Sequence, residues 1–85
     1  MYYVYILRCA DKTYYTGIAL DLDRRLSEHN GSNLGAKYTR ARRPVKLVYS
    51  RKFRTRSGAA KEEFRIKNLK REDKKNLVQN KTYAK

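Results

Sequence analysis

Two tyrosines at matching positions are the first residues of this chain that could do acid–base chemistry. Tyr5 lies within a run rich in Tyr, Val and Ile, and Tyr15 lies near the end of a second such run, with Ala10-Asp11-Lys12 between the two. This composition and spacing predict an antiparallel hairpin over 2–17, which can bring both hydroxyls to one surface. A phenol can donate or lose a proton, although a tyrosine in a strand more often only packs.

Arg25 and His29 form a second pair, four residues apart on an expected helix. The apolar pattern predicts a helix over about 22–29, with Asp21 as its N-cap. Residues at i and i+4 share one face, so Arg25 and His29 can act on one group, while Arg24 is expected to face water. Taken singly, the histidine would more often be a partly buried structural residue and the arginine a rim residue.

A polar, basic segment over 31–44 follows this helix. It reads GSNLGAKYTRARRP, and its two glycines and closing proline predict a loop rather than a continuous helix. Its cations could hold phosphates and its aromatic ring could stack on one base, although a charge run is usually only a solvated face. The residues expected to contact nucleic acid are Lys37, Tyr38, Arg40, Arg42 and Arg43.

Glu63 is the candidate metal ligand, on an expected helix over 58–70. The helical period places Glu63 in the middle of an apolar arc that includes Phe64, and places Glu62 beyond the edge of that arc. A carboxylate in apolar surroundings is costly unless it is paired or bound to a cation. Two interpretations remain open: an ordinary ion pair with Lys67 at i, i+4, or a ligand for a divalent metal.

The remaining elements complete a small domain that can position these groups. A third strand is expected over 45–53, the helix over 58–70 is expected to begin after Ser57 as its N-cap, and a last helix is expected over 71–78. The predicted fold class is therefore α+β, a three-stranded antiparallel sheet flanked by helices. At 85 residues the chain has room for one core, which predicts a single domain over 1–78 and a flexible C-terminal tail over 79–85.

The charge balance points to a polyanionic partner. The chain has 22 Lys and Arg residues against 8 Asp and Glu residues, a formal charge of +14. DNA is the expected partner and RNA is possible, because net charge does not distinguish the two. No membrane partner is expected, because no apolar stretch approaches the length of a spanning helix and the basic residues are spread over several elements.

The cysteine count and the first residues bear on the compartment. Cys9 is the only cysteine, so an internal disulfide is impossible, and this favours a reducing cytoplasm. The apolar start over 1–7 lacks a basic leader and is too short for a signal peptide, so it is expected to be a strand.

These motifs resemble the GIY-YIG endonucleases, whose name describes two tripeptides on adjacent strands. The tripeptides here are Tyr3-Val4-Tyr5 and Tyr15-Thr16-Gly17, with Tyr3 in the place of the family's first glycine. Arg25 and His29 are similar to the family's helix after the second motif, and Glu63 is similar to its metal-binding glutamate. The small stand-alone bacterial members look similar also over 36–40 and 43–45.

The resemblance implies a metal-dependent endonuclease that hydrolyses DNA phosphodiester bonds, structure-selective and active in DNA repair or processing. Glu63 would hold one Mg²⁺ or Mn²⁺, and Arg25 would neutralise charge in the transition state. Tyr5 would deprotonate or orient the attacking water, with Arg25 and the metal favouring its phenolate. His29 would relay the proton, and Tyr15 would position the water or the phosphate.

Target choice would then rest on the basic segment, with Gly17 as a further nucleic-acid contact, or on a partner protein. The alternative function is a non-catalytic basic module that binds DNA or RNA and has kept only the fold and the charge.

Overall fold

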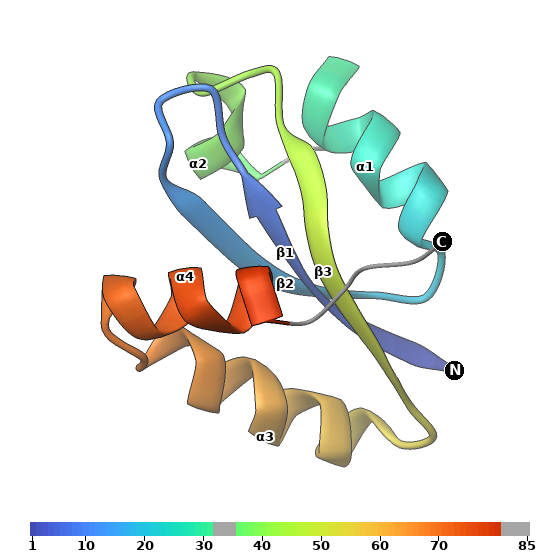
Figure 1. Cartoon of the computed structure of the whole chain (residues 1–85). Coiled ribbons are helices and arrows are strands. Elements are labelled where there is room, and N and C mark those ends of the chain that lie inside the picture. Colours follow the sequence, from blue (N-terminus) through green and yellow to red (C-terminus); the bar gives the residue numbers. More distant parts are fainter. Residues whose placement is uncertain (32–35, 81–85) are drawn as a thin grey trace.

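Three strands and four helices make up the computed structural model, which describes residues 1–31 and 36–80. In chain order they are β1 (Tyr2–Arg8), β2 (Tyr14–Ala19), α1 (Leu22–Gly31), α2 (Lys37–Arg40), β3 (Lys46–Phe53), α3 (Arg56–Lys67) and α4 (Arg71–Asn80). The strands form one antiparallel sheet in the order β2-β1-β3 (Figure 1). The predicted α+β fold is confirmed.

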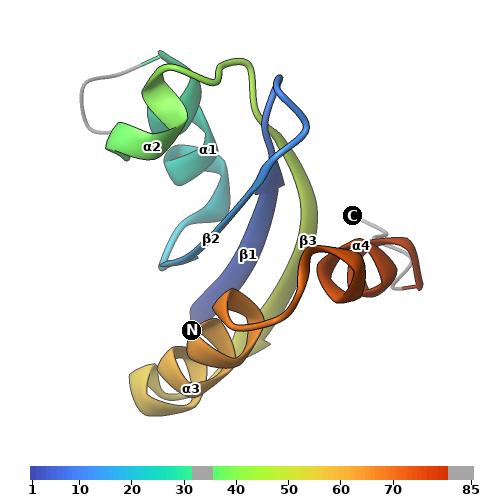
Figure 2. The same ribbon diagram turned by 90° about the vertical axis from the view of Figure 1, so that its left-hand side faces the viewer.

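The central strand, β1, is covered on both faces. Val4 and Ile6 point to one face, where they pack with residues of α3 and α4, and Tyr5 and Leu7 point to the other, where they pack with residues of α1. The helices accordingly lie on opposite sides of the sheet (Figure 2). A strand buried on both faces needs a nearly continuous apolar run, and this is what the sequence YVYIL supplies.

The predicted hairpin is confirmed, and its register is set by a tight turn. Asp11 Oδ1 accepts hydrogen bonds from the backbone N–H and the hydroxyl of Thr13, at 3.1 and 2.6 Å. Tyr5 is thereby placed opposite Gly17, and Leu7 opposite Tyr15. Neighbouring residues of a strand point to opposite faces, so Tyr5 and Tyr15 project on the same side of the sheet.

The first helix begins where the sequence predicts. Asp21 Oδ1 accepts from the N–H of Arg24 at 3.1 Å, which is the bond of an N-cap. Leu22 and Leu26 pack against the sheet, and the helix ends at Gly31.

The third helix differs from its prediction at both ends. The N-cap is Thr55, not Ser57: Thr55 has an extended backbone and its hydroxyl accepts from the N–H of Gly58 at 3.0 Å. The helix therefore begins at Arg56, and it ends at Lys67 instead of residue 70.

The two shorter helices also refine the prediction. The basic segment expected as a loop contains the single-turn helix α2, while 32–35 lies outside the described residues. The last helix, α4, docks through Leu77 and Val78 as expected and continues through Asn80, two residues into the predicted tail. The rest of that tail, 81–85, also lies outside the described residues. Within residues 1–31 and 36–80, no helix combines the length and apolarity needed to cross a bilayer.

Candidate active site

A buried chain of hydrogen bonds joins the first strand to α1 and α2. The Tyr5 hydroxyl lies 2.9 Å from His29 Nε2, and His29 Nδ1 lies 2.8 Å from Thr39 Oγ1. Tyr5 is 2% exposed, and His29 and Thr39 are fully buried. The structure therefore brings together Tyr5 and His29, which are 24 residues apart in sequence.

The bonds of Thr39 assign the His29 tautomer. The Thr39 hydroxyl donates its one proton to the carbonyl of Ala36 at 3.0 Å, so its oxygen accepts from His29 Nδ1–H. The Ala36 N–H lies 3.5 Å from Nδ1, which is too long to compete with these bonds. Nε2 is then an acceptor, and the Tyr5 hydroxyl donates to it.

Arg25 adds a cation to this cluster. Its side chain is 28% exposed, whereas that of Arg24 is 74% exposed, which confirms the predicted orientation of the two arginines. Arg25 and Tyr5 line one small cavity, and Arg25 Nη1 donates to Glu28 Oε1 at 2.8 Å. Glu28 also accepts from Arg24 Nε at 3.2 Å, so one carboxylate orients both guanidinium groups.

Burial controls the protonation of Tyr5 and His29. Desolvation raises the pKa of Tyr5 to about 12, although the hydrogen bond from Arg25 opposes this shift. Desolvation, and then the nearby charge of Arg25, lower the pKa of His29 to about 4. Arg25 favours the Tyr5 phenolate, as expected, but burial outweighs the arginine and leaves a neutral phenol beside a neutral imidazole in the resting protein.

Gly17 makes room for the Tyr5 ring. A Cβ placed on Gly17 would lie 2.6 Å from the Tyr5 hydroxyl oxygen and 2.8 Å from the ring carbon that carries it. The phenol therefore extends across β2 toward the edge of the sheet. Gly17 itself is buried, so the structure gives it a packing role, and its contact with nucleic acid stays a prediction.

Tyr15 lies in the same aromatic cluster. Its ring centroid is 6.4 Å from that of Tyr5, 5.1 Å from that of His29 and 5.9 Å from that of Tyr38. Tyr38 is 39% exposed, so this series of rings connects the buried Tyr5–His29 pair with the surface.

Glu63 belongs to the helix on the other side of the sheet, and the predicted phase of that helix is wrong. Phe64, expected within the apolar arc, is 71% exposed, and the buried residues of α3 are Ala59 and Ile66. Glu62 and Glu63 flank this buried line, with side chains 10% and 24% exposed.

Basic partners make this helix phase possible. Glu62 accepts from Arg65 at 3.0 and 2.7 Å, and Glu63 forms the i, i+4 ion pair with Lys67 at 3.3 Å. Both carboxylates are therefore charge-compensated although they are partly covered. The negative charge of Glu63 also contributes, as the smallest cause, to the raised pKa of Tyr5, which places the two groups within electrostatic reach.

The donor set near Glu63 suits a divalent ion held mainly by its substrate. Among the described residues, no three His, Cys, Asp or Glu side chains gather into a metal-binding group. Mg²⁺ commonly uses one or two carboxylates and takes its other ligands from water and phosphate oxygens. The partly exposed carboxylate of Glu63 fits that pattern, with Lys67 as its present partner.

Two arginines of the basic segment, Arg42 and Arg43, form hydrogen bonds within the fold. Arg42 Nε donates to Asp11 at 2.9 Å, its Nη1 donates to the carbonyl of Tyr38 at 2.8 Å, and its guanidinium stacks 4.0 Å over the Tyr38 ring. Arg43 donates to the carbonyls of His29 and Glu28 at the end of α1. Lys37 and Arg40 are exposed. Contact with nucleic acid stays a prediction for all of these residues.

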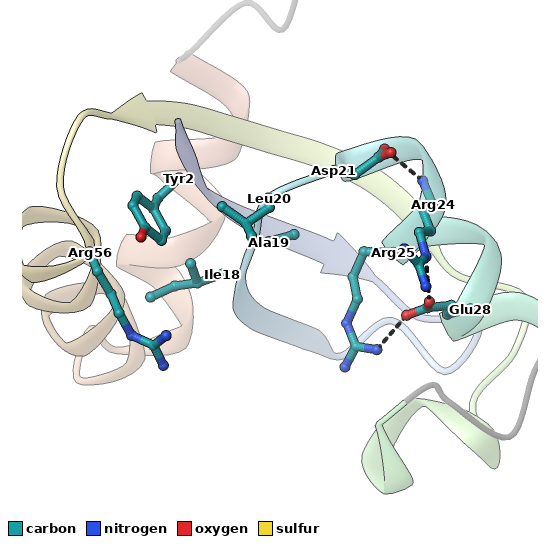
Figure 3. Close-up of a pocket in the computed structure, with 9 residues that line it drawn as sticks. All are labelled: Tyr2, Ile18, Ala19, Leu20, Asp21, Arg24, Arg25, Glu28 and Arg56. Atoms are coloured by element: carbon teal, nitrogen blue, oxygen red, sulfur yellow. Dashed lines mark hydrogen bonds and ion pairs between the residues drawn. The ribbon is translucent and has the colours of Figure 1, made fainter.

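A groove of about 360 Å³ opens beside the cluster of Arg25, Tyr5 and His29, along the outer side of β2. Arg56 and Tyr2 lie at one end, and Arg25 lies at the other, where it faces Glu28 (Figure 3). The apolar residues 18–20 lie between the two ends. We call this the β2 groove.

Thr39 and Glu28 are site residues that the sequence analysis missed. Thr39 fixes the His29 tautomer and Glu28 orients Arg25. Glu28 lies three residues after Arg25 on the same helix, so the spacing could have indicated it. Thr39 contacts His29 only because α2 folds back over α1, and no local pattern reports that contact.

Comparison with known proteins finds a family model and similar sequences that match most of this chain. The family model described as "GIY-YIG catalytic domain" matches residues 1–76, as the motifs led us to expect. Similar sequences include the UPF0213 protein DP2720 of Desulfotalea psychrophila, 53% identical over 91% of this chain and 70% of that protein. Another is the UPF0213 protein VNG_2274C of Halobacterium salinarum, 48% identical over 91% of this chain and 99% of that protein.

Solved structures of similar proteins share the fold. The solution structure of the UPF0213 protein BH0048 from Bacillus halodurans is 45% identical, with a TM-score of 0.62, and the match covers 95% of this chain and 86% of that one. The solution structure of EF2693 from E. faecalis is 39% identical, with a TM-score of 0.64, and the match covers 99% and 92%.

Proposed function

Because the chain belongs to the GIY-YIG family, we propose that it is an endonuclease that hydrolyses phosphodiester bonds of DNA. The observation that carries this proposal is the cluster of Arg25, Tyr5 and His29, in which the phenol is hydrogen-bonded to a neutral imidazole and lines one small cavity with the cation. Phosphodiester hydrolysis needs a positive group at the phosphate and an acceptor for the proton of the attacking water, and these three side chains supply both.

Tyr5 and His29 would activate the water in one concerted movement. As water attacks phosphorus, one of its O–H bonds breaks and its proton passes to the Tyr5 oxygen. The phenolic proton passes in turn from Tyr5 to His29 Nε2, which leaves an imidazolium that Thr39 still orients through Nδ1–H. This route avoids a free phenolate, which the raised pKa of Tyr5 disfavours, and a phosphate bound at Arg25 would offset the positive charge that helps to lower the pKa of His29.

Arg25 would bind the phosphate whose charge rises in the transition state. A guanidinium can donate two parallel hydrogen bonds to a phosphate, and Glu28 already holds it toward Tyr5. Tyr15 borders the same space through its contacts with the Tyr5 and His29 rings, and would limit where the water can lie.

Glu63 would hold the divalent ion, Mg²⁺ or Mn²⁺. When bound, such an ion stabilises negative charge on the phosphate and on the leaving oxygen. Glu63 must exchange its pair with Lys67 for the ion, and the 53% exposed Lys67 side chain is free to move into solvent. A role in DNA repair or processing, with selection of DNA structure, extends this proposal.

A non-catalytic binding module is the second candidate, and two observations favour it. Tyr5 is a neutral phenol in the resting protein, and Glu63 already has the partner expected of an ordinary surface glutamate. The formal charge of +14 supports binding to nucleic acid under either function.

Cleavage of a panel of labelled duplex, flap, branched and single-stranded substrates, with and without Mg²⁺, separates the two candidates. We expect Mg²⁺-dependent products from the wild type and none from Tyr5→Phe. The matched control is Tyr49→Phe, a buried tyrosine packed on the other face of the sheet. Binding without cleavage of any substrate would favour the binding module, whereas equal cleavage by both variants would reject the role of Tyr5.

A further inference from the structure

The β2 groove combines an apolar middle with arginines at both ends, and the carboxylates of Asp21 and Glu28 also line the Arg25 end. Ile18 and Leu20 line the middle, Arg56 lies at one end, and Arg25 lies at the other (Figure 3). Its volume of about 360 Å³ is within the range of sites that take small ligands. A ligand that matches these features has a flat, largely apolar body and negative charge on either side of it.

Leu20 marks the groove as a place where apolar surface is left open. Leu20 is 69% exposed although it follows directly on β2, whose residues are buried or partly buried. Tyr2 contributes an aromatic ring at the Arg56 end (Figure 3). Aromatic side chains stack on the face of any nucleobase, and apolar side chains can cover the face of a base that has left the stack, so such a surface favours contact with base faces over the reading of base edges.

Arg25 connects the groove with the Tyr5 cluster. Arg25 lines the groove and also lines a small neighbouring cavity together with Tyr5. Our further inference therefore rests on the proposed function, since Arg25 is the residue assigned to the phosphate that is cut. A strand held at Arg25 and continuing along the groove would bring its next phosphate toward Arg56.

Only an unpaired nucleotide can present its base to this surface. In a duplex both faces of a base are covered by stacking, and only its edges are accessible in the grooves. A base that contacts Leu20 and Ile18 with its face must lie outside the stack, and leaving the stack is least costly for a base that is already unpaired.

We propose that the β2 groove binds one unpaired nucleotide of the DNA substrate next to the phosphate held by Arg25. The base lies over residues 18–20 and its flanking phosphate lies at Arg56. The groove thereby selects DNA with a bulge, flap or frayed end over continuous duplex.

The test measures binding in EDTA, so that it does not depend on cleavage. Two labelled duplexes of equal length are compared, one fully paired and one with a single unpaired 2-aminopurine. We expect the wild type to bind the bulged duplex about 10-fold more tightly, the scale of stacking one base on a protein surface. The 2-aminopurine emission should change on binding.

Matched variants locate the effect. Leu20→Ser should remove most of the preference and the emission change, whereas Phe64→Ser, at a side chain 71% exposed and outside the groove, should keep both. Arg56→Ala should weaken binding of the bulged duplex several-fold more than Arg54→Ala, since Arg54 is exposed but does not line the groove.

Equal affinity of the wild type for both duplexes, or equal loss in the groove and control variants, would overturn the proposal. A preference that depends on Leu20 in a protein that cuts nothing would keep the groove and reject the nuclease. Cleavage with no such preference would keep the nuclease and reject the groove.

Discussion

The Tyr5 phenol lies over the backbone of Gly17, with its hydroxyl 2.6 Å from where a Cβ of Gly17 would be. The two residues are cross-strand partners, so the glycine gives the phenol a path across β2 to His29 and Arg25. A packing requirement in the hairpin therefore fixes the position of the group proposed to activate water.

Gly17→Ala should destabilise the fold and lower activity together. The added methyl would collide with the Tyr5 hydroxyl and ring, and overpacking of this kind costs about 1–3 kcal/mol. Urea unfolding and cleavage rates check both effects. Gly31→Ala is the control, because a Cβ there meets nothing within 4 Å. Equal stability of the two variants would show that Tyr5 moves aside without cost.

Thr39→Val should disturb the His29 tautomer without changing the shape of the site. The valine leaves His29 Nδ1–H without its partner, and an unsatisfied buried donor costs about 1–3 kcal/mol. The nitrogen NMR shifts of the imidazole should change, and turnover should fall by about 10- to 100-fold. Thr39→Ser should restore the shifts and most of the turnover. If serine restores stability alone, Thr39 is only structural.

Acid should destabilise the protein through His29. Its pKa is about 4 in the folded state against about 6.5 in an unfolded chain, so between these values only the unfolded chain takes up the proton. The free energy of unfolding should therefore fall as the pH falls, by up to about 1.4 kcal/mol per pH unit.

Urea unfolding at several pH values between 6.5 and 5 tests this dependence, before most carboxylates titrate. His29→Gln should have a much smaller slope in this window. The charged neighbours Arg25 and Arg43 further disfavour the imidazolium, whereas Glu28 favours it. The same slope in wild type and variant would contradict a neutral buried His29.

Arg25→Ala should lower kcat by about 10²- to 10³-fold, the scale of losing one charge contact in a transition state. Arg24→Ala should act mainly on KM, because Arg24 is 74% exposed and does not reach the Tyr5 cluster. Both variants lose a partner of Glu28, so the comparison cancels that loss. Equal effects on kcat would reject the role of Arg25.

Glu63→Gln should abolish Mg²⁺-dependent cleavage while DNA binding persists or tightens. Glutamine keeps the shape but loses the charge that a divalent ion needs. Glu62→Gln is the control: it should cut normally but unfold more easily, because it weakens the bonds to Arg65. The required data are cleavage rates and melting temperatures. Full activity of Glu63→Gln would reject the metal-dependent mechanism.

Local sequence patterns predicted the parts of the site that depend on local geometry. The period of two in the strands placed Tyr5 and Tyr15 on one face, and the helical period separated Arg25 from Arg24. The same reasoning failed for α3, because it assumed that Phe64 belonged to the buried face and that Glu62 lay beyond the edge of that face. Arg65 and Lys67 compensate the two carboxylates, and so Phe64 can face water.

Contacts between distant elements could not be predicted in this way. Thr39 and His29 meet because α2 packs over α1, and Arg43 was expected at phosphates but also donates to the end of α1. The pKa of Tyr5 depends on how completely the folded chain buries its hydroxyl, and the sequence alone contains no measure of that burial.

The position of β1 between two partner strands gives the site unequal local stability. The Tyr5 backbone is paired on one side with Gly17 and on the other with Ser50, so it can open only when much of the sheet opens. His29 and Thr39 instead belong to short helices at the periphery, which can detach in smaller fluctuations. Amide hydrogen exchange should therefore be slowest at Tyr5 and faster in α1 and α2. The proposed catalytic cluster would assemble and come apart from the histidine side, while the tyrosine stays in place.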